Sequence, residues 1–155
     1  MESQKKMSCK LISHRGNLNG PIERRENKVD YIMEAINLGY DVEIDLHYYA
    51  GSLYLGHDIK QEYFDVLTFE QAKGKLWIHC KDTKTLGFCI SNLVNWNYFF
   101  HEEDAATLTS KGYAWLHPNS KSAEFGILVW PEKIDFDITP YQGVCSDFVA
   151  PKNIG

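Results

Sequence analysis

The first half of the chain alternates between apolar stretches that predict strands and helices in turn. Residues 9–12 predict a short strand, and Ser13-His14-Arg15-Gly16 follow it. From Asn27 onward the apolar residues recur at helical spacing, and Gly39 is a typical C-terminal stop. Residues 41–46 then alternate with a period of two, which predicts a half-buried strand.

The remaining segments continue this alternation, with shorter connections in the second half. Strands that alternate with helices predict an α/β fold with a mainly parallel sheet. Because the later connections are too short for complete helices, we expect a trimmed TIM-type (β/α) barrel with reduced helices in its second half. The supporting segments are a hairpin-like return at 48–55, helices at 68–73 and 83–94, and strands at 76–78, 98–101, 113–116, 127–130 and 144–149.

The length of 155 residues predicts a single domain over residues 1–155, which is short for a full barrel. The formal charge of -5 gives no basic face for general nucleic-acid binding, so no nucleic-acid partner is expected. A small phosphorylated substrate remains compatible with this charge, because a metal ion and a few cations can invert the field inside a pocket. The aromatic share of 14% leaves room for a homo-oligomer surface.

The N-terminal segment and the cysteines both favour a cytoplasmic protein. The first residues contain lysines but no apolar run long enough for a signal peptide or a transmembrane segment. The four cysteines form no Cys-x-x-Cys pair, so we expect reduced thiols buried as small apolar groups.

Chemically capable side chains follow the predicted strands at their carboxyl ends. In parallel α/β folds these ends meet at one edge of the sheet, so residues remote in sequence converge there. We therefore expect one ligand site at this edge. Its candidates are His14 and Arg15 after the first strand, Glu43 and Asp45 near the end of the second, His57 after the hairpin, and His79 and Lys81 after the strand at 76–78.

Glu43 and Asp45 lie two residues apart on a strand, so both carboxylates point to the same face, about 6–7 Å apart along the chain. Facing solvent, they would form an ordinary polar face. Facing a barrel interior, they would repel one another and need a cation or a shared proton. Val42, Ile44 and Leu46 also need burial, and packing them against outer helices places the carboxylates inside.

Other polar and aromatic residues have two interpretations each. A single histidine is more often structural than catalytic, but His14 and His57 both follow strands, and such a pair could act as general base and general acid. Residues 101–104 either add to the rim of the site or form a solvated acidic loop. The remaining ambiguous residues are Trp115 and His117, which wall the site or pack in the core, and Asp147, which forms a salt bridge or lines the pocket.

Short motifs from His14 to Asp58 follow one another in a recognisable order and spacing. They are His14-Arg15-Gly16 at a strand end, Glu26-Asn27 before a helix that ends at Gly39, Glu43-Ile44-Asp45 on the next strand, and His57-Asp58. In this order the chain resembles the glycerophosphodiester phosphodiesterases, within the phospholipase C-like phosphodiesterase superfamily. Arg25 stands where the family has proline before the Glu-Asn pair.

One departure from the family pattern concerns the metal ligands. The family's next element is Glu-x-Lys, whose glutamate is a ligand, whereas this chain has His79-Cys80-Lys81. Imidazole can replace the carboxylate as a ligand, or the change weakens metal binding. Near the end, residues 143–147 resemble the family's last strand, and between residues 82 and 142 the resemblance is faint.

The resemblance implies a metal-dependent phosphodiesterase, a hydrolase of small phosphodiesters in which two histidines exchange protons with the substrate. The alternative is a non-catalytic phosphate- or metal-binding module on the same fold. By the resemblance the metal would be Mg²⁺, Mn²⁺ or Ca²⁺, and His79 would also suit Zn²⁺ or Fe²⁺. The implied roles are His14 and His57 as acid and base, Glu43, Asp45 and His79 as metal ligands, and Arg15, Lys81 and Asn27 as substrate- or phosphate-binding residues. The family's substrates range from glycerol-linked head groups to lysophospholipids and sphingolipids.

Overall fold

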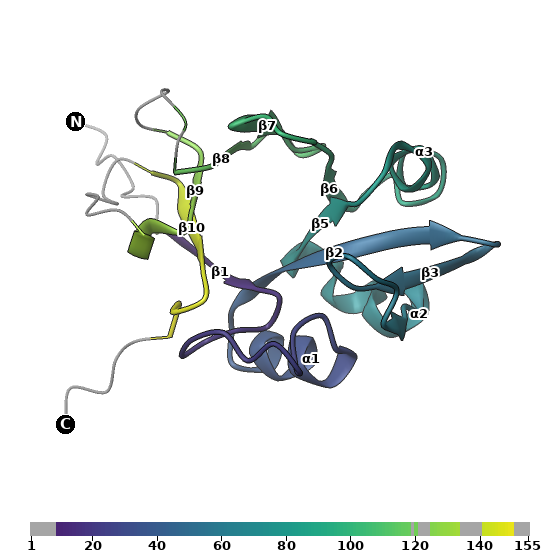
Figure 1. Ribbon diagram of the computed structural model, residues 1–155, viewed down its shortest axis with the longest axis horizontal. Coiled ribbons are helices and arrows are strands. Elements are labelled where there is room, and N and C mark those ends of the chain that lie inside the picture. The colour runs from purple at the N-terminus through teal and green to yellow at the C-terminus, as the bar shows by residue number, and fades with distance from the viewer. Residues whose placement is uncertain (1–8, 119, 121–124, 134–140, 151–155) are drawn as a thin grey trace, which may run out of the picture.

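The computed structural model describes residues 9–118, 120, 125–133 and 141–150. In this part of the chain ten strands form one curled mixed sheet (Figure 1). The strands are β1 (Lys10–His14), β2 (Asp41–Tyr49), β3 (Ser52–Leu55), β4 (Glu62–Tyr63), β5 (Leu76–Cys80), β6 (Asn97–Phe99), β7 (Ala106–Leu108), β8 (Ala114–Leu116), β9 (Ile127–Val129) and β10 (Gly143–Ser146). The helices are α1 (Val29–Asn37), α2 (Val66–Phe69), α3 (Thr83–Asn92) and the 3₁₀ turns η1 (Glu70–Lys75) and η2 (Pro131–Lys133).

The central strands of the sheet run parallel. Strand β1 pairs with β2 on one side and β10 on the other, β2 continues to β5 and β6, and β10 continues to β9 and β8. The strands β3, β4 and β7 run antiparallel to their neighbours. The N–H of Ser110, just after β7, donates to the carbonyl of Tyr98 in β6 at 2.8 Å, so the two ends of the curl approach one another.

The expected TIM-type barrel is wrong. Such a barrel needs a helix after each strand, and the described residues contain only three short α-helices together with three antiparallel strand pairs. The tight turn at Ala50-Gly51 explains part of this difference, because a two-residue connection can only return the chain antiparallel. The fold is therefore a curled mixed sheet with helices beside one half of it.

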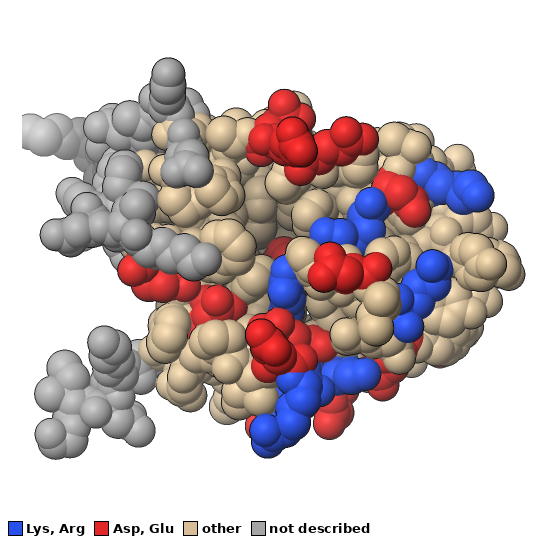
Figure 2. All heavy atoms as spheres, viewed as in Figure 1, with Lys and Arg blue, Asp and Glu red and all other residues tan. Residues whose placement is uncertain are grey.

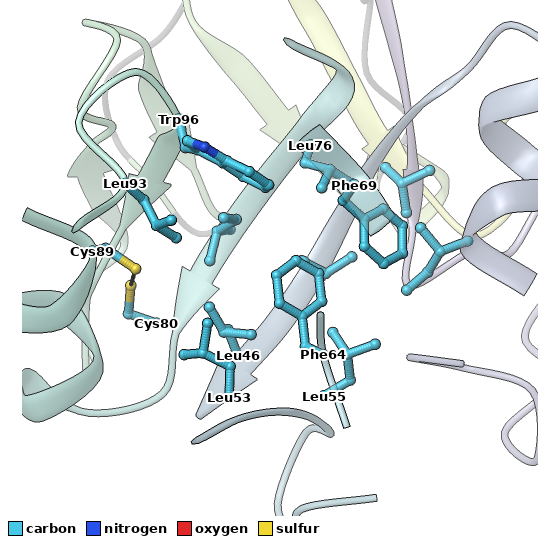
Figure 3. Close-up of a cluster of buried hydrophobic side chains, with 14 of the residues drawn as sticks. Leu46, Leu53, Leu55, Phe64, Phe69, Leu76, Cys80, Cys89, Leu93 and Trp96 are labelled. Carbon is cyan, nitrogen blue, oxygen red and sulfur yellow. Dashed lines mark hydrogen bonds between the residues drawn. The ribbon is translucent and has the colours of Figure 1, made fainter. Parts of the chain in front are cut away.

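The main core lies between the outer face of the sheet and the three α-helices (Figure 1). The helical period of α1 buries Ile32, Ala35 and Ile36 against β2. Figure 3 shows the part of this core where Phe64 and Phe69 stack, with ring centroids 4.9 Å apart. These contacts fix the helix-covered half of the sheet, which carries the predicted site. No helix among the described residues is long and apolar enough to cross a membrane.

A second cluster fills the inside of the curl below the site. It is made of aromatic and aliphatic side chains from both halves of the sheet. The rings of Phe99 and Trp115 lie 4.7 Å apart and those of Trp77 and Trp115 5.7 Å apart, so the two halves pack directly on one another. This cluster forms the floor on which the polar residues lie. Its buried members are Ile12, Trp77, Phe99, Trp115, Ile127, Val129 and Cys145.

Candidate metal and phosphate site

Alternation along β2 places its two acidic side chains inside the curl. Glu43 and Asp45 are 3% and 1% exposed. Val42, Ile44 and Leu46 face the other way and belong to the helix-covered core, as the alternating pattern predicted. Packing of the apolar face of β2 against the helices sets the orientation of the strand. This orientation places the two carboxylates in the interior of the curl.

The strand register brings two histidines beside these carboxylates. His79 in β5 is the direct neighbour of Asp45, and His14 in β1 is the direct neighbour of Glu43. Adjacent strands lie about 4.8 Å apart, so side chains on one face of paired residues touch. Nδ1 of His79 lies 3.2 Å from Oδ1 of Asp45, and Nε2 of His14 lies 3.7 Å from Oε2 of Glu43.

Glu43, Asp45 and His79 have the composition and spacing of a metal site. Each offers one ligand atom, and these atoms all lie within 4.8 Å of one another. The outer oxygen atoms Oε2 of Glu43 and Oδ1 of Asp45 are buried and accept no well-aligned hydrogen bond. Two carboxylates with an imidazole suit Mn²⁺, Fe²⁺ or Zn²⁺, so the residues fit a divalent ion of this kind.

Asp45 is surrounded by cationic and hydrogen-bonding groups. Nε of Arg15 lies 2.9 Å from Oδ2, and Nζ of Lys81 lies 3.7 Å from Oδ1. The side-chain amide of Asn27 donates to Oδ2 at 3.0 Å. Burial acts to raise the pKa of Asp45, but the contact with His79 and the charges of Arg15 and Lys81 outweigh it and lower this pKa. Asp45 is therefore ionised.

Glu43 lies two residues away but in a different electrostatic setting. Burial and the negative charge of Asp45 raise the pKa of Glu43 to about 8, with His14, Arg15 and Lys81 acting in the opposite direction. Arg15 and Lys81 lie closer to Asp45 than to Glu43. In the absence of a further cation, the carboxyl groups of Glu43 and Asp45 together therefore carry a charge smaller than two negative units. A bound cation would favour the ionised form of Glu43.

His14 is held on its other side by a residue from the end of the sheet. Nδ1 of His14 lies 2.7 Å from Oδ1 of Asp147, which follows β10, and the amide of Asn17 donates to the same oxygen at 3.0 Å. Burial acts to lower the pKa of His14, but Asp147 and Glu43 outweigh it and raise this pKa. Because Asp147 binds Nδ1, Nε2 is the nitrogen directed at Glu43 and the site.

His14, Glu43, Asp45 and His79 line a cavity of about 430 Å³ at the carboxyl edge of the parallel strands. Arg15, Lys81 and His57 also line it, so the cavity brings together both predicted catalytic histidines. Its opposite side consists of aromatic, apolar and acidic residues of the second half of the sheet. These are His101, Glu102, Asp104, Ala105, Thr107, Trp115, His117, Val129 and Trp130.

His79 is held in place by two rings on the neighbouring strand segment. Its ring lies parallel to that of Phe99 at 5.0 Å and to that of His101 at 4.7 Å. Burial lowers the pKa of His79, with the contact with Asp45 acting against it, and burial also lowers the pKa of His101 to about 4. Both rings are thus neutral near pH 7, and a neutral imidazole is the form that binds a metal.

The backbone around Arg15 is shaped to aim its side chain at Asp45. Arg15 and Asn27 both have positive φ, at 60° and 57°, and the N–H of Asn27 donates to the carbonyl of Arg15 at 3.1 Å. Such a conformation is costly for residues other than glycine and persists where surrounding contacts enforce it. Here the enforcing contacts are those of Arg15 with Asp45 and with Glu26, whose carboxylate lies 3.3 Å from Nη1.

The structure brings most of the predicted site residues to one cavity and separates one from it. Asn27 is 1% exposed and does not line the cavity; its amide bonds both the carboxylate and the N–H of Asp45. Asp147 and His101 are members of the site for which the sequence offered only open alternatives. The position of Asp147 directly after a predicted strand was the available signal, and its pairing with His14 depends on the register between β1 and β10.

Comparison of the chain with family models, with curated proteins and with solved structures finds no match. The functional assignment therefore depends on the geometry of the cavity and on the short motifs in the sequence.

Proposed function

We propose that the chain is a metal-dependent phosphodiesterase, a short and divergent relative of the glycerophosphodiester phosphodiesterases. The observation that carries this proposal is the meeting of Glu43, Asp45 and His79 within 4.8 Å, beside His14 in the same cavity. Acid/base cleavage of a phosphodiester needs a metal-binding group of side chains next to a histidine that a carboxylate holds in place.

Glu43, Asp45 and His79 would hold the metal ion. When bound, the ion would polarise a phosphoryl oxygen and offset the negative charge that develops on it. Oε2 of Glu43 and Oδ1 of Asp45, which are buried and accept no well-aligned hydrogen bond, are the atoms that would face the ion. A set containing an imidazole favours Mn²⁺, Fe²⁺ or Zn²⁺ over Ca²⁺.

His14 and His57 would move protons on either side of the scissile phosphate. In His14 the carboxylate of Asp147 accepts a hydrogen bond from Nδ1, so the neutral ring has its lone pair on Nε2, where it can take a proton. In His57 Nδ1 lies 2.8 Å from Oδ1 of Asp58, which leaves its Nε2 for the substrate in the same way. His57 is the more accessible of the two and is suited to the leaving group near the mouth.

Arg15 and Lys81 would bind the non-bridging phosphate oxygens. Both side chains line the cavity and lie within 4 Å of Asp45, so they are positioned without a substrate. Lysine acts as a point charge on phosphate, whereas the guanidinium of Arg15 retains donors beyond those directed at Asp45 and Glu26. Preorganised cations of this kind stabilise a charged transition state at little cost in reorganisation.

A direct test is hydrolysis of a panel of glycerophosphodiesters and lysophospholipids, each with Mg²⁺, Mn²⁺, Ca²⁺ or Zn²⁺. We expect turnover by the wild type and a fall of about 10²–10³-fold in His14→Ala and in Glu43→Gln. Glu23→Gln, an exposed change of the same chemistry, is the matched control and should match the wild type. Absence of turnover with every ion, or equal rates in the three variants, would overturn the proposal.

A second candidate is a binding module on the same fold that holds a phosphorylated ligand without cleaving it. The close pairing of Asp45 with Arg15 and Lys81 favours it, because these contacts already offset one carboxylate without a metal ion. Calorimetric binding of a phosphodiester with no product formed would select this function over catalysis.

A further inference from the structure

Five of the six histidines line the cavity, and the sixth, His47, lies behind it. His47 occupies the inner face of β2, two residues beyond Asp45, and is 9% exposed. Its Nε2 lies 2.7 Å from the carbonyl oxygen of Gly56. A carbonyl can only accept, so Nε2 carries the hydrogen and donates it. His47 thus binds the backbone of the residue directly before His57.

Gly56 is held at both of its backbone polar groups. Its N–H donates to the carbonyl of Asp45 at 3.1 Å and continues the β2–β3 ladder, while its C=O accepts from His47. Gly56 has a φ of +150°, and a Cβ at this position would lie 1.8 Å from the carbonyl oxygen of Ile59. Only glycine fits this close approach. The peptide group that enters His57 therefore has one orientation, set from β2.

His57 itself has few other contacts that could fix it. Its side chain is 44% exposed and, in the described part of the chain, forms an ion pair with its exposed neighbour Asp58, whereas the side chain of His14 is 10% exposed and held by Asp147. A surface ion pair between adjacent residues adds little positional control. The bonds of Gly56 to His47 and to Asp45 anchor the residue directly before His57, and the one from His47 holds the carbonyl of the peptide group shared with His57.

We propose that His47 is a positioning residue that fixes His57 over the cavity through the carbonyl of Gly56. The catalytic half of this inference depends on the proposed phosphodiesterase function, while the anchoring half can be measured without it. His47 is not among the residues that line the cavity, and its bond is to the backbone that leads to the second proton-transfer group.

His47→Leu removes the donor at similar size, and His47→Gln keeps an N–H that can reach the same carbonyl. Thr85→Val is the matched control, because the hydroxyl of Thr85 accepts a buried bond from the adjacent N–H of Tyr48 at 2.8 Å, on the side of β2 away from the cavity. The two variants at His47 alter the contact of β2 with the segment leading to His57, whereas Thr85→Val alters the contacts of Thr85 with Tyr48 and with Asp82.

The first measurement is amide hydrogen exchange over residues 56–61, where Gly56 and Gln61 donate to β2 and β3. Loss of one buried hydrogen bond predicts at least about tenfold faster exchange there in His47→Leu. We expect His47→Gln to stay within about threefold of the wild type, and Thr85→Val to leave this segment unchanged. Unchanged exchange in His47→Leu overturns the inference, whatever the activity.

The second measurement is diester turnover with Mn²⁺. Misplacement of a catalytic group predicts a fall in kcat of about 10–100-fold in His47→Leu, with the Mn²⁺ affinity unchanged and with recovery in His47→Gln. Equal loss in Thr85→Val would show a general packing effect and overturn the positioning role. If the wild type itself cleaves no diester, the proposed function fails, and the exchange experiment still decides whether His47 anchors the segment.

Discussion

The two halves of the curled sheet contribute different side chains to the same cavity. The half made of β1, β2 and β5 supplies the ionisable groups of the proposed metal and phosphate site, namely two carboxylates, a guanidinium, an ammonium and two imidazoles. The half made of β7, β8 and β9 supplies a wall of tryptophans and small apolar residues with an acidic rim. The first half thus carries the side chains proposed to bind metal and phosphate, and the second half supplies surface that can contact a ligand.

The difference between the halves follows from what covers their outer faces. The helices α1, α2 and α3 lie outside the first half and bury Val42, Ile44 and Leu46 (Figure 1). The second half has a smaller outer cluster around Leu128, and Leu108 is 69% exposed. Buried charges are tolerable only where their partners are held firmly, and helix packing provides that firmness for β2.

On the face shown in Figure 2, acidic and basic side chains are interspersed around a hollow near the middle. The described part of that face presents no continuous basic patch of the kind that binds the phosphate backbone of nucleic acids. The cations available to a phosphate in the cavity are the side chains of Arg15 and Lys81, which line it.

Among the variants that test this difference between the halves, Asp45→Asn should have the largest effect on turnover. Asp45 offsets the charges of Arg15 and Lys81 and is a proposed metal ligand, so its loss leaves Arg15 with Glu26 as its ion-pair partner, removes the carboxylate beside Lys81 and weakens the ion site. We expect turnover to fall by about 10³-fold, measured as kcat/KM at saturating Mn²⁺.

Asp104→Asn is the matched change on the acidic rim of the second half. Asp104 is exposed and lines the same cavity, so we expect less than about a threefold change. Equal losses in the two variants would contradict the assignment of the chemistry to the first half.

A stability comparison tests the role of the helices. Leu46 and Leu128 are both buried, at 0% and 3% exposure, but Leu46 lies in the helix-covered core and Leu128 in the smaller outer cluster. Leu46→Ala should lower the free energy of unfolding by about 3–5 kcal/mol and Leu128→Ala by about 2–3 kcal/mol, because the smaller cluster can relax into the space left. Urea denaturation measures both, and a larger loss in Leu128→Ala would reverse the comparison.

Much of the first half could be predicted from the sequence, because its signals are local. The helical period before Gly39, the alternation over 41–46 and the turn at Ala50-Gly51 each determine an element by themselves. That alternation predicts that Val42, Ile44 and Leu46 face the helices, whereas the burial of Glu43 and Asp45 also requires that the opposite face lie inside a curved sheet.

The second half could not be predicted to the same extent, because its order depends on contacts between distant strands. Strand β7 is three residues long and partly exposed, and it gains its place from pairing with β8 and from the bond between Ser110 and Tyr98. The pairing of His14 with Asp147 likewise needs the β1–β10 register, which no local pattern encodes. The barrel expectation was wrong for the same reason, since it required parallel strands with reduced helices in the second half, where β7 runs antiparallel to β8.

Stability as a function of pH probes the difference between the two carboxylates. A carboxyl whose pKa is higher in the folded than in the unfolded state stabilises the fold while it is protonated, and that contribution is lost as the pH rises. For Glu43, with a pKa raised from 4.5 to about 8 by burial and by Asp45, the loss runs between these two values in metal-free protein.

At 1.36 kcal/mol per pH unit, the free energy of unfolding of the metal-free wild type should fall by about 2 kcal/mol more than that of Glu43→Gln between pH 5 and pH 7. Urea titrations at the two pH values give this difference directly. The subtraction removes the histidines whose titration does not depend on Glu43, while His14, whose pKa Glu43 raises, contributes to the difference. Parallel pH dependence in the two proteins would show that Glu43 is ionised throughout and would remove the contrast with Asp45.

The smallest effect concerns the wall of the second half. Trp115 is 6% exposed and contributes one edge of the cavity, where it contacts the substrate's non-reacting part in the proposed function. Trp115→Phe should raise KM about threefold, close to 0.7 kcal/mol, and leave kcat unchanged, since contact area binds ground state and transition state alike. Trp96→Phe is the matched change in the helix-covered core and should alter neither constant. A fall in kcat for Trp115→Phe would place part of the chemistry on this half and erase the distinction between the two sides of the cavity.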